Sequence, residues 1–377
     1  MSSDNTRATN ASAAISTTST SPKNRFNVRQ GISMLALSLM LPLTLSACSS
    51  GSGSEAKEDA ADEVVVLRMS HFMPAPSAMN AEIFEPWAKK IEEESNGRIK
   101  IENFPGSTLT KPADTYEAVV NGRVDIGIQL QGYTSGRFPL SQIAELPGLS
   151  NSAAQMSCLM QTLYDNGTIA DEYEDSHVIS LYGLGPGALH STKLISKPDD
   201  MKGLRIRRPS AVAGDIIESM GAAPVGLPAT DIYTSLQRGV IDGLSLPWDG
   251  VPIFRVNELV KNHTNIPLYS SSVVMNMNKA KYDALPPDLQ KVIDDNSGMV
   301  LAQKVGAMLT EDDKEALQAA KDAGDTIVDI PDPLNNPAWA GPLKQGTQKY
   351  LDSVDANGAD ANAIYEKVKA ASKACQV

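Results

Sequence analysis

The chain has 377 residues, a formal net charge of −12 and a hydrophobic fraction of 42%. That length is enough for two domains, and the charged fraction of 21% is ordinary for a soluble globular protein. These values exclude wholesale disorder and collagen-like or membrane-embedded architectures. They also disfavour nucleic-acid binding, which needs clustered Lys and Arg, because the chain is acidic and only 5% aromatic.

The first 47 residues read as an export signal. Basic residues at Lys23, Arg25 and Arg29 precede an apolar run of about 14 residues, 32–45, which is too short to span a bilayer but suits a signal peptide. The run ends in Leu-Ser-Ala-Cys, which resembles the lipobox of bacterial lipoproteins. We therefore expect cleavage before Cys48 and acylation of its thiol. The alternative is a plain signal peptide whose small residues happen to precede a cysteine.

Residues 48–63 are small, polar and acidic, and they predict a flexible tether between a lipid-anchored Cys48 and the folded body. Two further cysteines, Cys158 and Cys375, remain. In an oxidising compartment they would form one disulfide that pins the C-terminal tail. The alternative of one buried thiol and one free terminal thiol stays open.

From residue 64 onward, strand-like and helix-like segments alternate. A β-branched run at 64–69, alternation at 99–104 and an apolar run at 124–130 predict strands. Apolar spacings of three and four predict helices at 79–91 and 116–120. Because strands separated by helices pair through crossovers, we expect parallel pairing and an α/β fold.

A second α/β set follows residue 177, which favours a second lobe. The expected strands are 180–184, 204–207, 224–227 and 241–246, and the expected helices are 213–220 and 232–236.

The C-terminal third is expected to be mainly helical. A near-3.6-residue apolar period without proline over 288–323 predicts one helix about 50 Å long that braces both lobes. Residues 331–342 read as a proline-rich loop, and 350–371 as a final helix.

No catalytic constellation is evident. The glycine-rich stretch 183–187 lacks the spacing of a dinucleotide fingerprint and contains a proline. The four histidines, His71, His177, His190 and His263, lack the paired spacing of a metal site. We therefore predict no catalytic residues, no cofactor and no metal.

Five segments together carry a resemblance to a known family. They are Asn121–Gly127, Gly136–Leu140, Asp200–Pro209, Gly221–Val225 and Leu236–Gly243. Here the sequence resembles the substrate-binding proteins of tripartite ATP-independent periplasmic (TRAP) transporters, the DctP-like family.

The resemblance implies a two-lobed, type II-like periplasmic-binding-protein fold with crossing hinge strands and a long bracing helix. We expect lobe I to comprise 64–184 and 273–315, and lobe II 185–272 and 316–377. The lobes would close over a small organic acid and deliver it to TRAP permease subunits. With the lipid anchor, this implies a periplasmic or cell-envelope location at a membrane, and no nucleic-acid partner.

Strand alternation places Arg205 and Arg207 on one face and Leu204 and Ile206 on the other. The resemblance implies that Arg207 binds the ligand carboxylate. A planar guanidinium suits this role because it offers two parallel donors.

Two positions depart from the family pattern. Many members have a second arginine where this chain has Gly187–His190, and many have an asparagine where it has Leu246 before a proline. Both changes indicate a less polar pocket and favour a monocarboxylate with an apolar or aromatic body. The candidate walls are Phe72, Tyr133, Leu246 and Trp248.

Polar ligand contacts are expected from two further places. Gln129 and Gln131 lie near the C-terminal end of a strand, where ligands dock in α/β sheets, and Gln129 is the stronger candidate. His190 is an alternative source of the missing polar contact.

Two other functions remain as alternatives. One is a secreted α/β hydrolase or isomerase acting on a small carboxylate, although the scattered histidines supply no obvious catalytic set. The other is an envelope protein that presents its closed form to a receptor instead of a permease.

Overall fold

The computed structural model describes residues 64–376, which fold around two β-sheets. The predicted signal peptide, Cys48 and the tether lie outside these residues. The first sheet has the strand order β2-β1-β3-β10-β4. Its strands are β1 (Val65–His71), β2 (Ile99–Phe104), β3 (Ile126–Leu130), β4 (Ser176–Pro186) and β10 (Ser270–Asn278).

The pairing of the first sheet is partly as expected. β1 pairs in parallel with β2 and β3, and this confirms the crossovers inferred from the sequence. β10, which the sequence did not reveal, inserts antiparallel between β3 and β4. The helices of this part are a π-helical turn (Met79–Phe84) that continues into α1 (Glu85–Glu94), then α2 (Thr115–Val120) and α3 (Ala153–Asp165).

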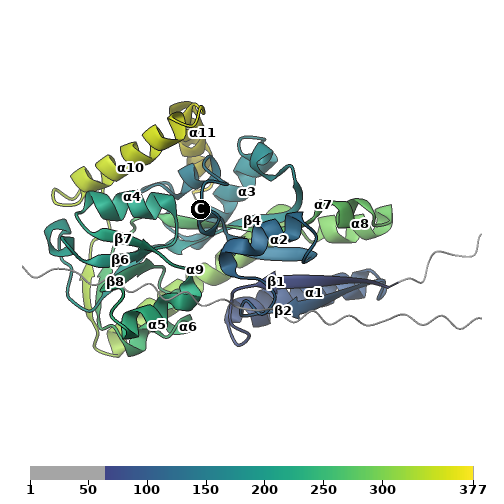
Figure 1. Cartoon of the computed structure of the whole chain (residues 1–377), viewed down its shortest axis with the longest axis horizontal. Coiled ribbons are helices and arrows are strands. Elements are labelled where there is room, and N and C mark those ends of the chain that lie inside the picture. Colours follow the sequence, from purple (N-terminus) through teal and green to yellow (C-terminus); the bar gives the residue numbers. More distant parts are fainter. Residues whose placement is uncertain (1–63, 377) are drawn as a thin grey trace, which may run out of the picture. The chain divides into compact units, whose positions relative to one another are not determined.

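The second sheet has the order β11-β9-β5-β8-β6-β7. Its strands are β5 (Ala188–Ser191), β6 (Arg205–Arg208), β7 (Ala223–Gly226), β8 (Gly243–Leu246), β9 (Asn262–Asn265) and β11 (Thr326–Asp329). In Figure 1, β6–β8 lie to the left of β1 and β2, with α4 (Ala211–Ser219) on one side and α5 (Ile232–Gln237) and α6 (Gly250–Ile253) on the other. The α/β class is thus confirmed for both sheets.

Two extended segments cross from one sheet to the other, as expected for hinge strands. β4 continues through Gly187 into β5, and β9 continues through 266–269 into β10. The segments are hydrogen-bonded to each other, because the Gly187 N–H donates to the Tyr269 carbonyl at 2.8 Å and the Leu268 N–H donates to the Gly187 carbonyl at 3.3 Å. A Cβ on Gly187 would lie 2.5 Å from the Tyr269 ring, so this close crossing requires glycine.

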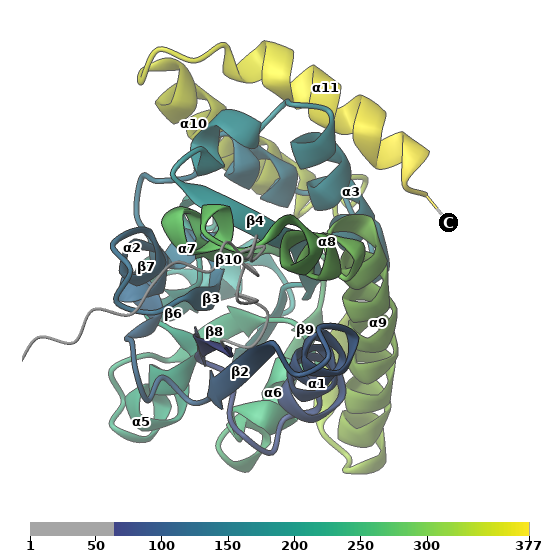
Figure 2. The same ribbon diagram turned by 90° about the vertical axis from the view of Figure 1, so that its right-hand side faces the viewer.

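The single long helix predicted over 288–323 is wrong. The structure has α8 (Pro287–Asp295) and, after a break, α9 (Gly298–Asp322), because Gly298 adopts a positive φ of 63°. α9 still has 25 residues, about 37 Å of helix, and it packs on α3 and β4 before leading into β11. Figure 2 shows it running along one side of the sheets. A short helix, α7 (Lys279–Asp283), precedes α8.

The final predicted helix is also divided. α10 (Ala340–Asp355) and α11 (Ala361–Ala374) are separated at Gly358, whose φ is +91°. α10 packs on α4, where Lys349 lies 2.9 Å from Asp215, whereas α11 packs on α3. Residues 316–377 are expected to belong to lobe II, but α11 contacts α3, which lies in the range expected for lobe I. The exact limits of the lobes stay a prediction.

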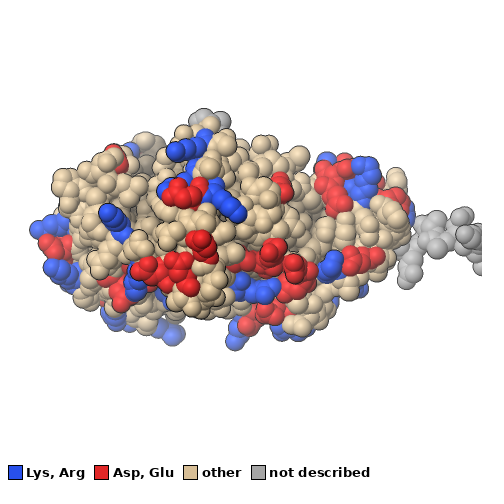
Figure 3. All heavy atoms as spheres, turned by 90° about the horizontal axis from the view of Figure 1, so that it is seen from above, with Lys and Arg blue, Asp and Glu red and all other residues tan. Residues whose placement is uncertain are grey.

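Charged side chains of both signs are interspersed on the face shown in Figure 3. Among the helices of residues 64–376, none combines the length and the apolar character needed to cross a membrane.

A disulfide links the C-terminal segment to α3. Cys158 of α3 and Cys375, just after α11, form a disulfide with a Cα–Cα distance of 5.7 Å and a sequence separation of 217. Of the two alternatives left open by the sequence, the structure therefore has the disulfide.

We expect the double substitution Cys158→Ser/Cys375→Ser to lower the unfolding free energy by roughly 2–5 kcal/mol, because the cross-link restricts a long loop of the unfolded chain. Urea denaturation with and without a reductant measures this loss. The reductant should destabilise the wild type and leave the double variant unaffected; equal curves for the oxidised and reduced wild type would contradict the expectation.

A buried acid lies behind β10. Glu145 accepts hydrogen bonds at Oε1 from the Ser272 N–H at 3.0 Å and the Ser272 hydroxyl at 2.7 Å, and its Oε2 has no partner within the described part of the chain. Burial raises the pKa of Glu145 from 4.5 to about 7, although the Ser210 and Ser272 hydroxyls favour the charged form. The folded protein therefore holds a proton over a pH range in which the unfolded chain has released it.

Because the folded state binds this proton more tightly than the unfolded state, Glu145 contributes to the unfolding free energy. The contribution is fully present below pH 4.5 and is lost as the pH rises through about 7. Relative to Glu145→Gln, the unfolding free energy of the wild type should fall by up to about 1.4 kcal/mol per pH unit in that window. Denaturation of both proteins across the window tests this. A difference between them that does not change with pH would refute the buried proton.

Candidate functional site

A cavity lies where the two sheets meet. It contains about 590 Å³ of space free of protein atoms, part of which is open to solvent. Residues of both sheets and of α9 line it. The polar lining residues are Tyr133, Tyr182, Arg207, Asp249, Tyr269 and Ser271, and the largest apolar ones are Phe72, Met73, Met79, Ile128, Leu130, Leu184, Leu246, Phe254 and Leu309.

Arg207 supplies the positive charge of the cavity. β6 carries its side chain to the interior, where the residue is only 1% exposed. Its Nε donates to the Leu227 carbonyl at 2.9 Å, Nη1 to the Ser245 carbonyl at 3.0 Å and Nη2 to the Tyr133 hydroxyl at 3.2 Å. A guanidinium has five N–H donors, so one N–H on each terminal nitrogen remains for another acceptor.

All the acceptors that Arg207 meets within residues 64–376 are neutral, and no carboxylate of this part lies within 4.0 Å of it. Two residues earlier on the same strand, Arg205 is exposed and is bonded to Asp242 through Nε at 2.9 Å and Nη2 at 2.8 Å. The strand therefore carries one arginine with an acidic partner at the surface and one without such a partner in the interior.

Two tyrosine hydroxyls stand at the same cavity. The Tyr133 oxygen accepts hydrogen bonds from Arg207 and, at 2.9 Å, from the Ala229 N–H, which leaves its own O–H free to donate. The Tyr269 hydroxyl is buried and makes no hydrogen bond within the described chain, and the nearby Ser245 hydroxyl donates to the Ala188 carbonyl. Free N–H and O–H donors thus collect beside Arg207.

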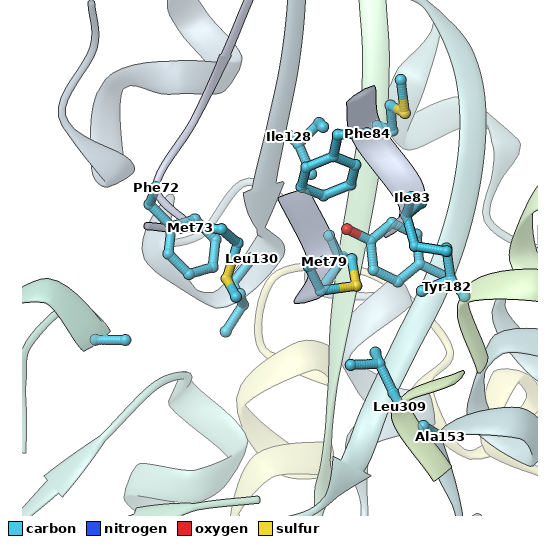
Figure 4. Close-up of a cluster of buried hydrophobic side chains, with 14 of the residues drawn as sticks. Phe72, Met73, Met79, Ile83, Phe84, Ile128, Leu130, Ala153, Tyr182 and Leu309 are labelled. Atoms are coloured by element: carbon cyan, nitrogen blue, oxygen red, sulfur yellow. The ribbon is translucent and has the colours of Figure 1, made fainter. Parts of the chain in front are cut away.

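The remaining surface of the cavity is mainly apolar. Figure 4 shows side chains from β3 and β4, from the residues just after β1 and from the π-helical turn gathered here, among them Met73, Met79, Leu130 and Tyr182. Phe72 meets the Tyr133 ring edge-on, with the ring centroids 5.6 Å apart. This lining would bury the apolar body of a ligand and exclude water from it.

Four of the seven ligand-site residues predicted from the sequence, Phe72, Tyr133, Arg207 and Leu246, line the cavity. Gln129 does not, and this prediction is corrected by strand alternation. Ile128 and Leu130 of β3 take the cavity face, so Gln129 points to the opposite face, where its Nε2 lies 3.5 Å from the Asn276 amide oxygen. Its neighbour Gln131 is also outside the cavity and is bonded to Tyr173 and Ser272.

His190 and Trp248 are not cavity residues either. His190 is fully buried between β8 and β9, with Nδ1 2.8 Å from His263 Nδ1 and Nε2 3.0 Å from the Leu246 carbonyl. Burial and then His263 lower the pKa of His190 to about 3, so its ring is neutral. Trp248 packs edge-on against His190 and donates to Asn265 Oδ1 at 2.9 Å. Both residues support the sheet behind the cavity.

Sequence reasoning missed several lining residues. Tyr269 and Ser271 belong to the second crossing segment, which was not recognised, and Leu309 belongs to a helix assigned only a bracing role. Asp249 follows Trp248 directly but was not singled out.

No group of three or more His, Cys, Asp or Glu side chains within residues 64–376 is arranged to hold a metal ion.

Comparison with known proteins assigns the family. Residues 69–352 match DctP, bacterial extracellular solute-binding protein family 7. The outer membrane transporter protein TsaT of Comamonas testosteroni is 28% identical over 319 residues, which cover 81% of this chain and 92% of that protein.

Two solved structures agree with this match. A marine-metagenome TRAP solute-binding protein, described as specific for aromatic acids and bound to 3-hydroxybenzoate, is 33% identical with a TM-score of 0.78 and covers 84% of this chain and 100% of its own. A TRAP solute-binding protein of Rhodoferax ferrireducens with copurified benzoate is 32% identical with a TM-score of 0.77 and covers 83% and 98%. The chain described here therefore belongs to family 7 of the bacterial extracellular solute-binding proteins, a family of transport proteins.

Proposed function

We propose that this chain captures an aromatic monocarboxylate in the cavity, with Arg207 binding the carboxylate, and delivers it to a TRAP-type membrane permease. The observation that carries the proposal is the buried guanidinium of Arg207, which has neutral partners and two unused N–H groups in an otherwise apolar cavity.

A buried charge without an opposite charge is costly, and a ligand carboxylate would offset that cost. The two free N–H groups of Arg207 would make a bidentate contact, and the Tyr133 and Tyr269 hydroxyls would donate to the same carboxylate. The ligand would thus receive charge and orientation from one end of the cavity.

The apolar lining supports an aromatic or similarly apolar body for the ligand. Where many family members have a second arginine, this chain has Gly187–His190, and Leu246 takes the place of a polar residue at the cavity wall. The two structural relatives bound to 3-hydroxybenzoate and benzoate favour the same ligand class.

Ligand contacts from both sheets support closure of the two lobes around the acid. Tyr133 follows β3 of the first sheet, yet it is bonded to Arg207 of the second sheet and to Ala229, which follows β7 of that sheet. A ligand carboxylate would join this set of contacts and favour the closed arrangement, as in hinge-bending binding proteins.

Capture without turnover is favoured over a hydrolase or isomerase. None of the histidines within residues 64–376 is among the residues that line the cavity, and the one His–His–Asp cluster, His190, His263 and Asp325, lies behind the sheet. The family is also one of transport proteins. Quantitative recovery of a bound acid unchanged after incubation would support capture; a converted product would support the enzyme.

Replacing Arg207 tests the assignment of the ligand site. We expect Arg207→Ala to weaken benzoate binding by roughly 30-fold to several thousand-fold, equivalent to about 2–5 kcal/mol, because the ligand charge would lose its partner. Isothermal titration calorimetry measures this change. Arg207→Lys should keep part of the affinity, since the charge remains but the planar pair of donors is lost.

The matched control is Arg205→Ala, which removes an arginine from the same strand outside the cavity. It should bind benzoate like the wild type. Unchanged affinity in a folded Arg207→Ala variant would overturn the role of Arg207 as the carboxylate anchor.

We also propose that Cys48 carries a lipid that holds the protein at a membrane, which rests on the Leu-Ser-Ala-Cys motif. Labelled palmitate fed to expressing cells should enter the wild type and be absent from Cys48→Ala. Equal labelling of both proteins, or no labelling of the wild type, would contradict the anchor.

A further inference from the structure

Two acidic residues meet beside the cavity, of which Asp249 lines the cavity itself and Asp313 lines a different pocket. Asp249, directly before α6, lines the cavity, and its backbone N–H donates to Oδ1 of Asp313 in α9 at 2.8 Å. Gly185 of the crossing strand β4 leaves the space for this pair, because a Cβ on Gly185 would overlap Asp313 Oδ2. The pair thus joins the second sheet to α9 beside the hinge.

No Lys, Arg or His of the described chain lies within 4.0 Å of either carboxyl group, and the adjacent Lys314 is paired with Glu311. Burial, followed by the charges of Asp313 and Asp312, raises the pKa of Asp249 well above its ordinary value. Burial raises the pKa of Asp313 to about 6, although the N–H groups of Asp249 and Trp248 favour its charged form. Two carboxyl groups buried side by side without a cation resist carrying two charges, so the pair favours a state with one shared proton and one negative charge.

We propose that the Asp249–Asp313 pair selects the ligand, by repelling a second carboxylate and by accepting a hydrogen bond from a neutral polar group on the bound acid. The inference rests on the proposed function. It accounts for a preference of the protein for monocarboxylates over dicarboxylates. One carboxylate finds Arg207, whereas a second would face the charge of the pair with no cation beside it. Asp249 is the member of the pair that lines the cavity, so its carboxyl oxygens are the ones that a hydroxyl or amide of the ligand would reach.

The charge effect is separated from ligand size by comparing acids of the same shape. Calorimetry is done with benzoate, with isophthalate against 3-carbamoylbenzoate, and with terephthalate against 4-carbamoylbenzoate. In the wild type, at least one carbamoyl compound should bind about 100-fold more tightly than its dicarboxylate partner, since like charges at a buried site cost several kcal/mol.

The variant Asp249→Asn/Asp313→Asn removes the charge of the pair with little change in volume. It should reduce the preference for the carbamoyl compound by at least about 10-fold, and a far-UV circular dichroism spectrum like that of the wild type reports that the variant is folded. The matched control is Glu145→Gln, which neutralises a buried acid outside the cavity lining and should leave the preference unchanged. Should the double variant fail to bind benzoate, the single variant Asp313→Asn is measured in the same way.

Several results would overturn the inference. They are equal affinity of the wild type for a carbamoyl compound and its dicarboxylate, no binding of either carbamoyl compound, or a preference that the variants leave unchanged. Each can occur while benzoate still binds through Arg207. Failure of the proposed function is a separate result, in which the wild type binds no aromatic monocarboxylate.

Discussion

The site depends on one positive charge that residues 64–376 bury without an acidic partner. Three neutral oxygens hold the Arg207 guanidinium in place, and they come from Tyr133, Leu227 and Ser245. Because these contacts fix the orientation of the group but leave its charge uncompensated, they support the proposal that the cavity is arranged for an anion before one binds. The nearby tyrosine hydroxyls extend this arrangement, and the apolar lining restricts what can accompany the anion.

Tyr269 belongs both to the lining of the cavity and to one of the two crossing segments. The Tyr269 carbonyl accepts a hydrogen bond from Gly187 at the point where the two crossing segments meet, and the Tyr269 side chain lines the cavity. The ring lies so close to Gly187 that a side chain there would displace it. A ligand that contacts the Tyr269 hydroxyl would therefore act on the segment about which the lobes would move, and this couples occupancy to closure.

The sequence was informative where a residue's role follows from its own strand or from a specific motif. It predicted the α/β class, the parallel core of the first sheet and the placement of Phe72, Tyr133, Arg207 and Leu246 around one cavity. It failed where the answer depends on partners far away in the chain. The antiparallel β10 and the pairing of His190 with His263 have no local signal, and apolar periodicity alone concealed the break at Gly298. Gln129 was predicted at the ligand site because it lies near the C-terminal end of a strand. That position indicates the edge of the sheet, but it does not show to which face of the sheet the side chain points.

The disulfide between Cys158 and Cys375 has a consequence for biogenesis. Its two cysteines are 217 positions apart, so the bond can form only after the chain has been synthesised as far as Cys375. Thiol oxidation is rare in a reducing cytosol. A copy that folded in that compartment would hold α11 against α3 by packing alone, without the covalent link.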